Sequence, residues 1–173
     1  MEQWYALHCK PNSERIVAEK LGHERIEAFY PHSVQKSRDG YRSIELKFFP
    51  GYAFARFDLL HSRPAVVEIP QVVSILGWGR HPVAIPDFEV DAVRLIVNTP
   101  QVKAAADCPF VTAGDRVRVT RGPLRDLEGF VVYTKGGARV IVSISMLARS
   151  ISAEVDGDAL ELLDGREGLK KAA

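Results

Sequence analysis

Near the C-terminus, residues 114 to 164 alternate short apolar stretches with turn residues, which constrains the fold more than any other feature. Val117 and Val119 alternate with arginines, and a second alternating run covers residues 140 to 144. Pairs that favour tight turns separate these runs: Gly122-Pro123, Gly136-Gly137 and Asp156-Gly157. A lone hairpin cannot bury enough surface to be stable, so four or five such strands predict a small β-barrel.

The first 97 residues have a different pattern, in which expected strands and helices follow one another. Residues 3 to 8 read as a strand with large apolar residues on both faces, which is typical of an interior position in a sheet. Apolar residues then recur at helical spacing between residues 14 and 22, and again between 87 and 97. Between these helices, residues 29 to 57 predict a hairpin and a further strand, and residues 62 to 69 predict a short helix. The expected class is α+β, with an N-terminal α/β sandwich whose mixed or antiparallel sheet has flanking helices.

Residues 98 to 113 show neither the spacing of apolar residues typical of a helix nor the alternation typical of a strand. Pro100, Pro109 and the run of alanines from 104 to 106 interrupt any regular element, so we expect a linker between domains 1 to 97 and 114 to 164. Residues 165 to 173 lack apolar anchors and are expected to fray. With this linker, the barrel is expected to move independently of the N-terminal domain.

Composition limits the possible partners and compartments. The net charge of +1 gives no general attraction to nucleic acid, so any DNA or RNA contact must be local. No apolar run approaches the roughly twenty residues of a membrane span, and the N-terminus does not resemble a secretion signal. Cys9 and Cys108 lie in different predicted domains and read as free thiols. We therefore expect a cytoplasmic monomer with no membrane contact.

Three stretches resemble the NusG family of transcription factors, in the family's order. The opening WYALHCKPNSERIVAEKL resembles the first strand and helix of its N-terminal (NGN) domain, and KFFPGYAFARF resembles that domain's central segment. The third stretch, from AGDRVRV to SISAEVD, is similar to the KOW motif and the SH3-like barrel built on it. The resemblance implies a factor that binds the clamp helices of the largest RNA polymerase subunit and raises processivity.

Details of the sequence look most like the specialised paralogs of the RfaH and UpxY type, which act on long operons. These details are a short N-terminal domain, the stretch WGRHPVAIPDFEVDAVR and the form of the KOW segment. The alternative is a KOW-containing protein that binds ribosomes or RNA mainly through its barrel, because ribosomal proteins also carry this motif.

The resemblance also implies a polymerase-binding surface. In the family, the segment that matches Phe49, Pro50, Gly51 and Tyr52 forms an apolar surface together with Trp4 and Tyr5, and exposed aromatic anchors suit a binding hot spot. By pattern alone, the same segment could be a core turn, and Trp4 could be partly core. Residues matching the part that faces the polymerase gate loop are His61, Ser62 and Arg63.

The first predicted helix and its ends carry five basic residues, and their role has two possible interpretations. Acidic residues at 14, 19 and 24 are interleaved with them, which favours a solvated, salt-bridged face. The alternative is a surface for the non-template DNA strand, as specialised paralogs use. The basic residues are Lys10, Arg15, Lys20, His23 and Arg25.

On the barrel, one loop matches the family's surface for NusE, with the ribosome behind it, or for Rho. It consists of Ser145, Met146, Leu147, Ala148 and Arg149. Met146 and Leu147 could instead fill the barrel, although strand alternation would let only one of them point inward.

The sequence shows no recognisable catalytic or metal-binding motif. His8 and Cys9 are adjacent, but no second pair stands at metal-ligand spacing. Asp87, Glu89 and Asp91 alternate on a predicted helix, so they point in different directions and are expected to complement the helix dipole. We expect no enzyme activity, no metal and no cofactor.

Overall fold

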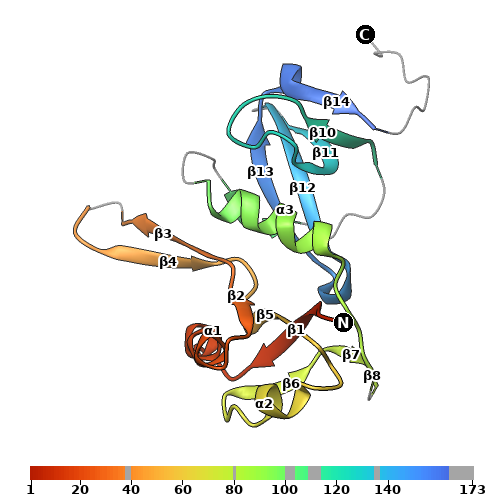
Figure 1. Ribbon diagram of the computed structural model, residues 1–173. Coiled ribbons are helices and arrows are strands. Elements are labelled where there is room, and N and C mark those ends of the chain that lie inside the picture. The colour runs from red at the N-terminus through yellow and green to blue at the C-terminus, as the bar shows by residue number, and fades with distance from the viewer. Residues whose placement is uncertain (38–39, 80, 100–103, 109–113, 135–136, 164–173) are drawn as a thin grey trace.

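The computed structural model of the protein describes residues 1–37, 40–79, 81–99, 104–108, 114–134 and 137–163 (Figure 1). It is an α+β structure with a four-stranded sheet, a six-stranded sheet and two separate hairpins. None of the helices in these ranges is long and apolar enough to cross a membrane. The predicted class is confirmed.

The four-stranded sheet belongs to the N-terminal half. Its order is β2-β5-β1-β6, and every pairing is antiparallel. These strands are β1 (Gln3–Cys9), β2 (Glu27–Phe29), β5 (Tyr52–Phe57) and β6 (Val72–Ile75). As expected, β1 is an interior strand, because it pairs with β5 on one side and β6 on the other.

Helices cover both faces of this sheet. Side chains alternate across β1, so that Tyr5 and Leu7 join one buried cluster with α1 (Glu14–His23) and α2 (Arg63–Val67). Trp4 and Ala6 join a second cluster, with α3 (Asp87–Val97). The result is the predicted sandwich of helices, sheet and helix.

Two hairpins extend this part of the chain. The predicted one is formed by β3 (His32–Lys36) and β4 (Ser43–Lys47), paired from His32 with Lys47 to Lys36 with Ser43. The other consists of β7 (Gly77–Trp78) and β8 (His81–Pro82). Gly77 is required there, because a Cβ at this position would lie 1.9 Å from the carbonyl oxygen of His81.

The six-stranded sheet, called the C-terminal sheet below, is antiparallel in the order β14-β10-β11-β12-β13-β9. Its strands are β9 (Ala104–Cys108), β10 (Arg116–Val119), β11 (Glu128–Thr134), β12 (Gly137–Ile144), β13 (Arg149–Val155) and β14 (Leu160–Leu162), with the 3₁₀ turns η1 (Ser145–Leu147) and η2 (Gly157–Ala159). The expected linker is wrong over residues 104 to 108, because these pair with β13 as an edge strand of the sheet. Backbone hydrogen bonding to a neighbouring strand outweighs the poor strand propensity of alanine.

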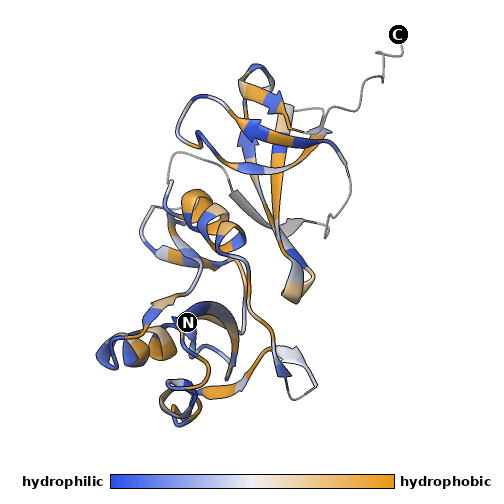
Figure 2. Ribbon diagram, turned by 45° about the vertical axis from the view of Figure 1, so that its right-hand side comes forward, coloured by the Kyte–Doolittle hydropathy of each residue, from blue (hydrophilic) through white to orange (hydrophobic). Residues whose placement is uncertain are grey.

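Helix α3 lies between the two sheets (Figure 1) and carries apolar residues along its length (Figure 2). Val90, Val93 and Ile96 are buried in one cluster that continues from Trp4 to Val142 of the C-terminal sheet. The apolar core is therefore continuous from the N-terminal sandwich to the C-terminal sheet.

Candidate functional site

The predicted polymerase-binding segment, residues 49–52, forms a tight turn between β4 and β5 and is called the aromatic segment below. Tyr52 donates its backbone N–H to the carbonyl of Phe49 (3.0 Å), and Gly51 has a left-handed φ of 85°. Phe49 is only 2% exposed and packs edge-on against Phe54, with ring centroids 5.7 Å apart. Pro50 is exposed and Tyr52 is half-buried. The expectation of an exposed aromatic anchor is therefore wrong for Phe49 in this conformation.

A buried carboxylate fixes this turn. Glu14 at the start of α1 accepts hydrogen bonds from the Gly51 N–H and from Lys47 Nζ, both at 2.8 Å. Burial disfavours the charged form of Glu14, but these two hydrogen bonds, its own backbone N–H and the positive charge of Lys47 together outweigh burial and lower the pKa of the carboxyl. The acid thus holds β4, the turn and α1 together.

Trp4 and Tyr5 are both buried, on opposite faces of the sheet. Trp4 lies on the α3 side, where the Arg94 guanidinium sits 4.6 Å from its ring centroid. Tyr5 belongs to the α1 side and contacts Phe57, with ring centroids 4.8 Å apart. The prediction that both residues contribute to one exposed surface is wrong, because adjacent residues of a strand point to opposite faces.

The three residues expected to face the gate loop lie beyond the other end of β5. His61 and Arg63 are exposed, and Ser62 precedes α2 without a side-chain capping bond. His61 Nδ1 is 3.3 Å from Asp58 Oδ1. The length of β5, roughly 17 Å at the usual rise, separates this group from the aromatic segment.

The basic residues on α1 and beside its two ends are exposed, and two of them are engaged in side-chain contacts. Arg15 pairs with Glu45 of β4 at 2.8 Å, and Lys20 Nζ donates to Gln71 Oε1 at 3.0 Å. Lys10, His23 and Arg25 are exposed. The contact of Arg15 supports the salt-bridged interpretation for that residue.

The second predicted surface, residues 145–149, is a 3₁₀ turn followed by Ala148 in the left-handed region (φ 47°) and is called the C-terminal loop below. Met146 and Leu147 are both half-buried and both pack against the continuous core. The alternation argument fails here, because a 3₁₀ turn does not place successive side chains on opposite faces.

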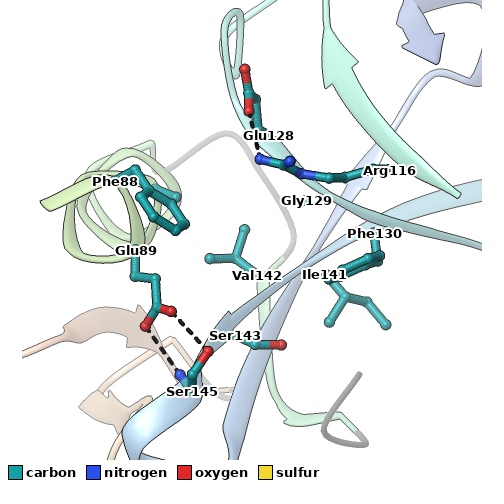
Figure 3. Close-up of a pocket in the computed structure, with 11 residues that line it drawn as sticks. Phe88, Glu89, Arg116, Glu128, Gly129, Phe130, Ile141, Val142, Ser143 and Ser145 are labelled. Carbon is teal, nitrogen blue, oxygen red and sulfur yellow. Dashed lines mark hydrogen bonds and ion pairs between the residues drawn. The ribbon is translucent and has the colours of Figure 1, made fainter. Parts of the chain in front are cut away.

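The C-terminal loop contacts both helix α3 and the aromatic segment. Glu89 of α3 accepts hydrogen bonds from the Ser145 N–H (3.0 Å) and the Ser145 hydroxyl (2.8 Å), as Figure 3 shows. Arg149 Nη1 is 3.3 Å from the carbonyl oxygen of Pro50, and its guanidinium lies 5.4 Å from the Tyr52 ring centroid. The expectation that the barrel moves independently is thus contradicted in this conformation, because polar bonds and apolar packing join it to the sandwich.

A cavity of about 340 Å³ remains beside this contact, between α3 and the C-terminal sheet (Figure 3). Phe88 and Ala92 line it from the helix, and Phe130, Ile141 and Val142 line it from the sheet. The Arg116–Glu128 ion pair, 3.3 Å long, stands at its edge. The facing surfaces therefore do not fill all the space between them.

Glu89 and Arg94 are the functional candidates that sequence reasoning missed. Glu89 is 7% exposed and binds the opposing loop, whereas the sequence suggested only a helix-dipole role. Arg94 covers Trp4 and forms an ion pair with Glu27 at 2.8 Å. Only their position beside buried apolar residues of α3 could have indicated these contacts. In the described parts of the chain, no three His, Cys, Asp or Glu side chains gather as metal ligands would.

Comparisons with known proteins agree with this architecture. The family model described as "Transcription termination factor nusG" matches residues 2–94. The transcription termination/antitermination protein NusG of Vibrio parahaemolyticus is 32% identical over 94% of this chain and 97% of its own length. NusG of Deinococcus radiodurans is 28% identical, over 89% of this chain and 95% of its own. A solved structure described as "Domain interaction in Thermotoga maritima NusG" has a TM-score of 0.53 at 18% identity, covering 95% of this chain and 98% of that one. The chain therefore belongs to the NusG family, whose members are transcription factors and not enzymes.

Proposed function

We propose that this protein is a transcription elongation and antitermination factor that binds the clamp helices of the largest RNA polymerase subunit. The observation that carries the proposal is the contact between the aromatic segment and the C-terminal loop. Apolar surfaces that serve partners are unfavourable in water when uncovered. In the free protein, Arg149 of the C-terminal loop contacts Pro50 and lies over the ring of Tyr52, so each segment partly shields the other.

Binding would use the edge of the aromatic segment that remains accessible once the C-terminal loop leaves. Pro50 and Tyr52 form this edge, and the buried Phe49 supports it from below. A factor that binds the elongating conformation of polymerase more tightly than other conformations shifts the population toward elongation without chemistry. Processivity would rise by this differential affinity.

The same step would release the second surface. Polymerase and the C-terminal sheet compete for the aromatic segment, so polymerase binding frees Met146, Leu147 and Arg149 for NusE, with the ribosome behind it, or for Rho. The freed loop offers a small apolar contact beside a cation, which suits a transient interface strengthened by tethering on the transcribing complex.

A finer proposal concerns the set of genes served. We place this protein with the specialised paralogs that act in the bacterial cytoplasm on a few long operons, on the sequence features that resemble the RfaH and UpxY type. Genome-wide occupancy along transcription units tests it. Occupancy at a few loci supports the assignment, and uniform occupancy assigns the protein to general transcription.

Polymerase binding is tested with full-length protein and an immobilised clamp-helix fragment. Glu89→Ala removes the bonds to Ser145 and should bind better than wild type, and adding Tyr52→Ala to it should reduce binding by more than tenfold, since hot-spot aromatics contribute about 2 kcal/mol or more. Tyr133→Ala in the same background is the control, because this exposed tyrosine lies on the C-terminal sheet. Equal binding by the Tyr52 and Tyr133 variants would refute the aromatic surface.

The alternative, a KOW-containing protein that binds ribosomes or RNA directly, predicts a different capture pattern. Tagged protein would retain ribosomes in lysates in which transcription is blocked, whereas our proposal predicts retention of polymerase under the same conditions.

A further inference from the structure

The cavity of about 340 Å³ between α3 and the C-terminal sheet has walls from both halves of the protein (Figure 3). Phe88 and Ala92 form the helix wall, and Phe130, Ile141 and Val142 form the sheet wall. Pockets that bind small molecules usually measure about 300–1,000 Å³, are mostly apolar and occur where two domains meet. The size, lining and position of this cavity therefore suit a small ligand.

Phe88 indicates which kind of molecule fits the cavity. This side chain is 66% exposed although it lines an apolar space. Phe130 on the opposite wall is half-buried. Aromatic rings pair well with other rings in stacked or edge-on arrangements. A flat aromatic ligand would cover apolar surface of both phenylalanines that water now contacts.

A buried carboxylate gives the cavity a negative charge. Glu89 lines the cavity at 7% exposure, and it forms no ion pair with any residue that the structure describes. Its hydrogen bonds come from the N–H and the hydroxyl of Ser145, which use two of the roughly four acceptor positions of a carboxylate. Buried charges are usually paired with an opposite charge. The remaining positions therefore favour a ligand with a positively charged group.

We propose that this cavity binds a small aromatic cation, with the ring between the two apolar walls and the ammonium group on Glu89. Arg116 and Glu128 at the edge of the cavity compensate each other, so they do not reverse the preference that Glu89 sets. An anion of the same shape would place a second negative charge beside a buried carboxylate. A neutral molecule would bury the same apolar area but leave Glu89 without a counter-charge.

Such a ligand also acts on the conformation of the protein. The complete site exists only in the closed form, in which α3 and the C-terminal sheet are in contact. A ligand that binds only one of two forms shifts their ratio about tenfold at a concentration of ten times its Kd. The aromatic cation therefore holds the protein closed. Its effect on polymerase rests on the proposed function, because only there does closing shield the polymerase-binding surface.

The first experiment compares three indole probes on full-length protein. Tryptamine is a cation, tryptophol is its neutral counterpart, and indole-3-acetate is an anion of similar size. Binding is followed by NMR through the methyl signals of Ala92, Ile141 and Val142, with Val17 in the other buried cluster as the remote reference. Tryptamine should bind about tenfold more tightly than tryptophol, since a hydrogen bond between charged groups is stronger than a neutral one, and indole-3-acetate should bind most weakly.

Two substitutions on α3 locate the site. Ala92→Phe fills the cavity from the helix and should weaken tryptamine binding at least tenfold, whereas Asp91→Phe adds the same side chain at an exposed position and should keep the wild-type affinity. Glu89→Gln should bring the ratio of tryptamine to tryptophol affinity close to one. Any opening caused by this change weakens both probes alike, so the ratio reports the charge alone.

The outcomes separate the binding site from its consequences. Equal affinity for the three probes, tightest binding of indole-3-acetate, no shift with tryptamine at up to about 10 mM, or unchanged binding in Ala92→Phe would each overturn the site. In an Arg149→Ala background, which lacks the contact with Pro50, tryptamine should lower the ratio of open to closed protein, measured by energy transfer between dyes on the β3–β4 hairpin and β14. An unchanged ratio would overturn the closing role. Closing without weaker capture by the clamp-helix fragment would contradict the proposed polymerase surface and leave the ligand site standing.

Discussion

Removing the Glu89 carboxylate should weaken the contact between the C-terminal sheet and the N-terminal sandwich. Glu89 accepts two hydrogen bonds from Ser145, and a hydrogen bond to a charged group contributes about 1.5–3 kcal/mol. Ser145 is exposed, so water replaces part of this interaction and about 2 kcal/mol in total is a reasonable magnitude. We expect Glu89→Ala to raise the ratio of open to closed protein roughly thirtyfold.

Single-molecule energy transfer between a dye in the β3–β4 hairpin and one on β14 measures this ratio directly. Asp91→Ala is the matched control, because Asp91 is an exposed acid two residues further along the same helix. Glu89→Gln should lie between the two, since the amide keeps an acceptor oxygen but loses the charge. The reasoning is refuted if Glu89→Ala and Asp91→Ala give the same distance distribution.

Three further predictions concern the stability and reactivity of the sandwich. Phe49→Ala should lower the free energy of unfolding by about 3–5 kcal/mol in urea titrations, because it leaves a cavity against Phe54. Tyr52→Ala should lower the free energy of unfolding much less. Equal losses would contradict the assignment of Phe49 to the core. The lowered pKa of Glu14 means that its contribution to stability is present above the unfolded-state pKa and is lost as the pH falls through the folded-state pKa. The difference in the free energy of unfolding between wild type and Glu14→Gln should therefore narrow from pH 7 to pH 3. A constant difference would contradict the stabilising role of the ionised carboxylate. Burial raises the pKa of the Cys9 thiol to about 11. Iodoacetamide at pH 8 should therefore alkylate Cys9 in the folded protein far more slowly than in the unfolded protein, as measured by peptide mass spectrometry. Equal rates would disprove this protection.

The sequence was informative wherever periodicity reports burial directly. The apolar residues on both faces of residues 3 to 8 predicted an interior strand, and β1 is one. The alternating apolar residues after residue 114 predicted short strands, and β10 to β13 are neighbours in an antiparallel sheet, although the connection from β12 to β13 is a 3₁₀ turn without glycine. Local patterns determine these elements, so a single sequence was sufficient.

Contacts between distant segments could not be predicted in the same way. Helical spacing places Glu89 on the same face of α3 as Val93 and Ile96, but Ser145 is 56 residues away and no local pattern identifies it as the partner. Likewise, the alanines of β9 have weak strand propensity, and only the free edge of β13 gives them a partner. The burial of Phe49 follows from the turn that Glu14 holds, through a bond between residues 14 and 51 that no local pattern encodes.

The Glu89–Ser145 contact is one part of what holds the two halves of the protein together. Its two hydrogen bonds contribute about 2 kcal/mol, and the apolar core that continues from Trp4 to Val142 adds to them. A partner that displaces the C-terminal loop from the aromatic segment must therefore overcome both contributions. Removing the Glu89 carboxylate lowers only the first of them, so it shifts the balance between closed and open protein without abolishing the closed form.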